Sequence, residues 1–131
     1  MKIESQITEI ENTPEKVFNF LSDFNNFQQM MPPQITDWKS TADECTFVIK
    51  GMASLGMKIT ERKPYEQITV ISHGGKIPFS FTMFVKIIPN GSHCKGQILF
   101  ESDMNPMMKM MVEKPLTNFI NMLSAKMKEI K

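Results

Sequence analysis

The chain has 131 residues, of which 41% are hydrophobic and 22% are charged, and 15 Lys and Arg stand against 14 Asp and Glu. This length is typical of one domain, here residues 1–131, and the composition is typical of a folded chain. Because neither sign of charge dominates, we expect no nucleic acid partner. No apolar run approaches the roughly 20 residues that span a bilayer, so we expect no stable membrane insertion.

The N-terminal residues and the cysteines favour a cytoplasmic location. The segment from Met1 to Gln6 is polar and alternating, without the apolar stretch of a secretory signal. The two cysteines, Cys45 and Cys94, lie far apart in sequence. We interpret them as free thiols in a reducing compartment.

The first part of the chain predicts one strand and then two short helices. Residues 2–10 alternate between polar and apolar side chains, which places Ile3 and Ile7 on one face of a half-buried strand. Thr13 before Pro14 marks the start of a helix, because threonine caps the free N–H groups and proline suits the first turn. A second short helix follows and ends at the prolines at positions 32 and 33.

The middle of the chain predicts a series of antiparallel strands. Asn90-Gly91 is a preferred pair for a two-residue hairpin turn and joins the last two strands. In Phe79–Pro89 the apolar residues share one face almost without interruption. The predicted strands are Ile35–Ser40, Cys45–Met52, Leu55–Arg62, Gln67–His73, Phe79–Pro89 and His93–Ser102.

The last 27 residues predict a long amphipathic helix. Asn105 caps it, Pro106 occupies its first turn, and Pro115 predicts a kink. Its apolar residues recur at helical spacing: Met108, Val112, Leu116, Phe119, Leu123, Met127 and Ile130. The pattern therefore predicts an α+β fold, with a curved antiparallel sheet of about seven strands wrapped around this helix and two short helices after the first strand.

Three segments resemble the START-like superfamily, also called the SRPBCC or helix-grip fold. They are Asn12-Thr13-Pro14-Glu15-Lys16-Val17-Phe18, the segment from Ser22 to Phe27 with its stop at Pro32-Pro33, and Asn105-Pro106-Met107 at the start of the last helix. The resemblance implies a deep cavity between sheet and helix. In relatives this cavity receives lipids, sterols, polyketides, plant hormones or quinones, and some relatives are cyclases or hydrolases. The superfamily has no shared catalytic signature, so no catalytic residue is carried over.

The inward strand positions and the helix face give the expected ligand-binding residues. Methionine is unusually frequent, with 13 residues, and flexible thioethers suit a deformable pocket wall. The same side chains also suit a solid core without a ligand. The expected lining is Met57, Ile59, Val70, Phe79, Phe81, Met83, Ile98 and Phe100 from the sheet, and Met107, Met108, Met111, Phe119 and Leu123 from the helix.

Glu61 is the one ionisable residue among the candidates. It shares the parity of Met57 and Ile59, so it either points into the cavity, where its pKa would be raised and it could act as an acid or base, or it reaches water beside Arg62. His73 and His93 lie beside turns without a second metal ligand at a suitable spacing, so the sequence indicates no metal site and no cofactor.

These patterns favour binding over catalysis. We expect the chain to bind a small hydrophobic molecule, lipid-like or aromatic, in the cavity between sheet and helix. The alternatives are a polyketide cyclase or dehydratase that uses Glu61, and a protein-interaction module that docks a partner on its Met-rich helix. The ligand and the oligomeric state do not follow from the sequence.

Overall fold

The computed structural model describes residues 1–52, 54–77 and 79–130. Its strands are β1 (Lys2–Glu4), β2 (Thr8–Ile10), β3 (Ile35–Ser40), β4 (Glu44–Ile49), β5 (Ser54–Lys63), β6 (Gln67–Gly75), β7 (Phe81–Asn90) and β8 (His93–Ser102). Its helices are α1 (Pro14–Leu21), α2 (Phe24–Phe27) and α3 (Pro106–Lys126), with short 3-10 helices η1 (Gln28–Met30) and η2 (Met127–Glu129).

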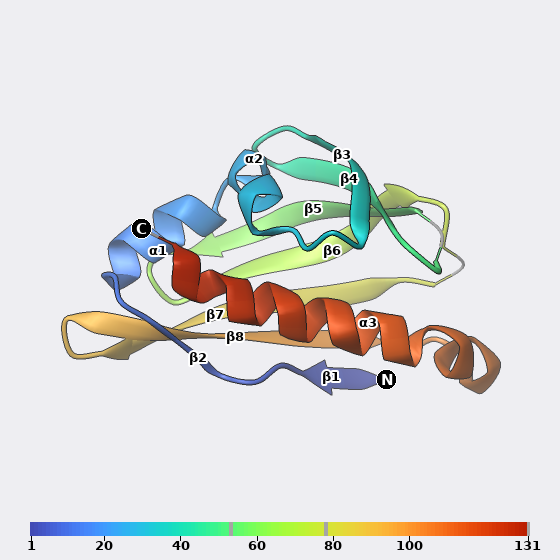
Figure 1. The fold of residues 1–131 in the computed structure, drawn as a ribbon. Helices are drawn as coiled ribbons and strands as arrows, with labels where there is room; N and C mark the ends of the chain where they lie inside the picture. The colour runs from blue at the N-terminus through green and yellow to red at the C-terminus, as the bar shows by residue number, and fades with distance from the viewer. Residues whose placement is uncertain (53, 78, 131) are drawn as a thin grey trace.

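The strands form one antiparallel sheet, and α3 lies across one of its faces (Figure 1). The strand order is β1-β8-β7-β6-β5-β4-β3, and β2 also pairs with β8. From β4 to β8, each strand pairs with the strand that precedes it in the chain. The predicted α+β helix-grip fold is confirmed.

The sheet has eight strands rather than about seven because the predicted first strand is divided. Ile3 pairs with Phe100 and Thr8 pairs with Gly96, so the N-terminal strand has one residue more than β8 between these two pairs. An extra residue reverses the faces of the side chains that follow it. The prediction that Ile7 is inward is therefore wrong: Ile7 is 55% exposed, and Thr8 is buried in its place.

Local signals explain where the helices begin. The Thr13 hydroxyl accepts a hydrogen bond from the Lys16 amide at 3.2 Å, and the Asn105 side chain accepts one from the Met108 amide at 2.8 Å. Each cap satisfies one of the N–H groups that a helix start leaves without a partner. α3 continues through Pro115, and the kink there stays a prediction.

The strand bounds follow the turn residues. The predicted strands 35–40 and 93–102 match β3 and β8. The predicted strand from Cys45 ends three residues early, at Ile49, because Gly51 turns the chain with a φ of 87°. In the last hairpin Asn90 pairs with His93, so the turn residues are Gly91 and Ser92, one position later than predicted.

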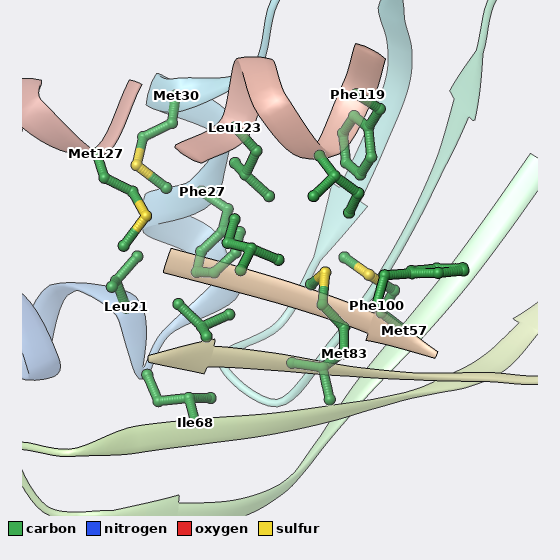
Figure 2. Packing of buried hydrophobic residues seen from close by; sticks show 14 of the residues in the cluster. Leu21, Phe27, Met30, Met57, Ile68, Met83, Phe100, Phe119, Leu123 and Met127 are labelled. Carbon is green, nitrogen blue, oxygen red and sulfur yellow. The ribbon is translucent and has the colours of Figure 1, made fainter. Parts of the chain in front are cut away.

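The core lies between the sheet and α3. Side chains of the helix, such as Leu123 and Phe119, and of the strands, such as Met83 and Phe100, occupy the space between them (Figure 2). α1 and α2 add the buried Leu21 and further aromatic side chains at the end of the same core. The buried side chains of α3, from Val112 to Leu123, therefore face the sheet.

Candidate functional site

Most of the expected ligand-binding residues are buried between sheet and helix. Phe79 and Met108 are half-buried at the margin of the core. The fully buried members are Met57, Ile59, Val70, Phe81, Met83, Ile98, Phe100, Phe119 and Leu123. Their burial agrees with the expected inward faces, while their role in ligand binding stays a prediction.

Aromatic contacts fill part of the space in which we expected a cavity. The rings of Phe81 and Phe100 stack with their centroids 4.9 Å apart. The ring centroids of Phe47 on β4 and Phe119 on α3 are 5.6 Å apart, so these two side chains connect the sheet directly to the helix. These side chains contact one another as in a packed core.

A hollow of about 320 Å³ lies at the margin of this core, beside the first half of α3. We call it the apolar hollow. Its residues come from the turn after β4, the loop after β6 and the helix: Gly51, Met52, Ile77, Phe79, Met108, Met111 and Val112. Every side chain in this set is apolar, so the hollow offers dispersion contacts and burial rather than charge.

A larger hollow of about 750 Å³ adjoins it through the shared residue Phe79. Its walls carry hydroxyl, carboxyl and amide groups: Ser80, Thr82, Glu101, Ser102, Asp103 and Asn105, with Phe81 and Met104. Two hydroxyl groups in or beside this hollow already have hydrogen-bond partners. Ser102 donates to the Ser80 carbonyl at 2.6 Å, and the Ser72 hydroxyl accepts from the Phe81 amide at 3.1 Å.

Glu61 does not face the interior: of the two positions that the sequence left open, the structure has the one at the surface beside Arg62, and the inward alternative is wrong. Ile59 pairs with Val70 while Glu61 pairs with Thr69, so β5 carries one extra residue at this point. The bulge turns Glu61 to the exposed face, where its carboxylate accepts a hydrogen bond from the Thr69 hydroxyl at 3.4 Å. Arg62 takes the next position and donates to the Ser22 carbonyl at 2.8 Å.

The expected inward positions of Met107 and Met111 are also wrong. Met107 is 75% exposed and Met111 is 68% exposed. The inward row of α3 is the predicted stripe of Met108, Val112 and Leu116, at a spacing of four residues, and Met107 and Met111 lie on the outer side of it. Met111 still borders the apolar hollow from this side, whereas Met107 does not.

Comparison with solved structures identifies the architecture. Protein TTHA0849 from Thermus thermophilus is similar at a TM-score of 0.76 and 12% identity, covering 98% of this chain and 95% of that one. A protein from Arthrobacter aurescens reaches 0.77 at 12% identity, covering 98% and 84%. A START superfamily protein from Mycobacterium smegmatis reaches 0.62 at 15% identity, covering 91% and 96%. The chain has a START-like fold. No family model and no curated protein matches the sequence.

Within this START-like fold the remaining candidate groups lie at the surface. His73 Nε2 is 2.7 Å from Glu44 Oε1, and both side chains are exposed. His93 is exposed at the first position of β8, directly after the hairpin turn. Across the described ranges, the structure groups no three His, Cys, Asp or Glu side chains as a metal site. None of the helices in these ranges combines the length and the hydropathy needed to cross a membrane.

Both thiols lie inside the START-like fold and are free, as expected. Burial raises the pKa of Cys45 from 9.0 to about 12, partly offset by a backbone hydrogen bond from Met57. Burial also raises the pKa of Cys94. Because only the thiolate is a good nucleophile, both cysteines are poorly reactive in the folded protein.

We predict that Ellman's reagent at pH 8 reacts slowly with the native protein and rapidly with both thiols in guanidinium chloride. The pKa of the Cys45 thiol is 9.0 in the unfolded chain and about 12 in the folded protein. The stability that comes from burying this neutral thiol is therefore fully present below pH 9. It is lost as the pH rises toward 12, because ionisation then favours the unfolded chain. Rapid labelling of native protein at pH 8 would contradict this burial.

Proposed function

We propose that the protein binds a small apolar molecule at the apolar hollow, between the first half of α3 and the loops after β4 and β6. The observation that carries the proposal is the wholly apolar set of side chains around this space of about 320 Å³. Small-molecule sites commonly measure roughly 300–1,000 Å³. A ligand that buries about 200 Å² of apolar surface would gain roughly 5 kcal/mol before the costs of association.

The neighbouring groups support this choice of ligand class. The larger hollow, which shares Phe79 with the apolar hollow, offers hydroxyl, carboxyl and amide groups. A ligand with an apolar body and one polar end therefore fits both spaces. Flexible thioethers of Met52 and Met108 can adapt to different shapes, which favours a range of related ligands over one.

The enzymatic alternative requires an acid or base inside the pocket, and Glu61 was the only such residue in the expected lining. Glu61 is exposed on a bulge of β5, and the apolar hollow has only apolar side chains. The carboxylates of Glu101 and Asp103 line only the neighbouring larger hollow, so the apolar hollow itself suits binding better than acid–base cyclisation.

Met108→Trp should fill the apolar hollow and weaken binding of the neutral fluorescent probe N-phenyl-1-naphthylamine by at least about tenfold. Met110→Trp is the matched control, because Met110 is on the same helix but is 85% exposed and outside the hollow. Fluorescence titration measures both, after circular dichroism has shown equal folding. Equal loss in the two variants, or no enhancement with the unchanged protein, would disprove the proposal.

A further inference from the structure

The methionines differ strongly in their access to solvent. Met107, Met110 and Met111 are 75%, 85% and 68% exposed. They stand at spacings of three and four residues in α3, so the three thioethers share one outer face of the helix. Four other methionines are 3% exposed or less: Met30, Met57, Met83 and Met127.

We propose that this outer face is an oxidation site for hydroperoxides, and that oxidation of Met111 weakens uptake of apolar ligands. A sulfur lone pair attacks one peroxide oxygen, the O–O bond breaks, and an S–O bond forms. With hydrogen peroxide, the displaced oxygen takes up a proton and leaves as water, while the oxygen now bonded to sulfur releases its own proton. Sulfur loses two electrons and the peroxide gains them, giving methionine sulfoxide.

Exposure makes the site selective. The peroxide must reach the sulfur atom, and packing excludes it from the four buried thioethers. The face carries no cysteine, and both thiols of the chain are buried with raised pKa values, so they do not compete as thiolates. The thioethers of the exposed methionines are therefore the sulfur atoms that a peroxide can reach in the folded protein.

The position of Met111 connects oxidation to binding. Met111 borders the apolar hollow together with Met108 and Val112, whereas Met107 and Met110 do not line it. A sulfoxide is polar and prefers hydration, so at Met111 it disfavours an apolar occupant. This step rests on the proposed function, while the oxidation site itself does not.

Peptide mapping by mass spectrometry after limited hydrogen peroxide treatment tests the site. We expect Met107, Met110 and Met111 to gain oxygen at least about tenfold faster than the four buried methionines. In guanidinium chloride the rates should become similar, because unfolding removes the protection. Comparable rates in the native protein would overturn the proposed site.

Paired variants test the effect on binding. Each protein is compared with itself before and after peroxide, using N-phenyl-1-naphthylamine. Oxidation should weaken binding several-fold in the unchanged protein and in Met107→Leu/Met110→Leu, which retains Met111, but not in Met111→Leu. An equal loss in Met111→Leu, or no loss in the double variant, overturns the role of Met111. If the unoxidised protein binds no probe, both the proposed function and the role of Met111 in binding fail. Peptide mapping of the sulfoxides still tests the proposed oxidation site.

Discussion

Replacing Phe47 with alanine should lower the free energy of unfolding by about 3–5 kcal/mol. Phe47 is 1% exposed. Its ring stacks on the Trp38 ring with centroids 5.2 Å apart, and its centroid is 5.6 Å from that of Phe119. It therefore connects β3 and β4, at the edge of the sheet, to α3. Removing the ring leaves a void that the surrounding rigid elements cannot fill, and the aromatic contacts are lost as well.

Denaturant unfolding followed by circular dichroism measures this loss. Phe47→Leu keeps most of the volume and should cost clearly less than Phe47→Ala. Ile88→Ala is the surface control, because Ile88 is 36% exposed on β7, and we expect a change of about 0.5 kcal/mol. If Phe47→Ala were no more destabilising than Ile88→Ala, the connection between β4 and α3 would not be important for stability.

The elements with local signals were predictable from the sequence. Thr13 and Asn105 are caps whose hydrogen bonds involve residues three positions away, so a short window contains all the necessary information. The inward rows of β7 and β8 follow from alternation over ten residues each, long enough to define the buried face.

The errors at Ile7 and Glu61 have a common physical cause. Each lies just after a point where one strand has an extra residue relative to its partner. Alternation assumes an unbroken pleat, and a single inserted residue exchanges the two faces. Where the insertion occurs depends on the partner strand, for example on the two hydrogen bonds between Ser5 and Ile98, and not on the nearby sequence.

The candidate site was harder to predict for a different reason. Four of the first six residues of α3 are methionine, so this part of the helix is apolar on several sides. The helical spacing from Met108 correctly gives the inward row, but the neighbouring methionines are equally apolar, and adding Met107 and Met111 to the expected lining was the error. The apolar hollow also depends on loops after β4 and β6, whose approach to α3 only the folded chain defines.

Gly56→Ala should destabilise the protein by about 3 kcal/mol or more, at the upper end of the usual cost of overpacking. A Cβ atom at Gly56 would lie 2.0 Å from the His73 carbonyl oxygen and 2.8 Å from the Gly74 carbonyl carbon. Both are backbone atoms of β6, the strand that pairs with β5. These backbone atoms can move away from the added Cβ only if the pairing of β5 and β6 is disturbed.

Gly96→Ala provides the matched comparison in the same sheet. Its added Cβ would lie 2.4 Å from the terminal methyl carbon of Met127, which is the end of a flexible side chain. Met127 can change rotamer, so we expect a smaller loss, about 1 kcal/mol. Thermal unfolding of the two variants should therefore show a clearly lower Tm for Gly56→Ala. The reverse order would mean that β5 and β6 separate more easily than the packing of Met127 against β8 rearranges.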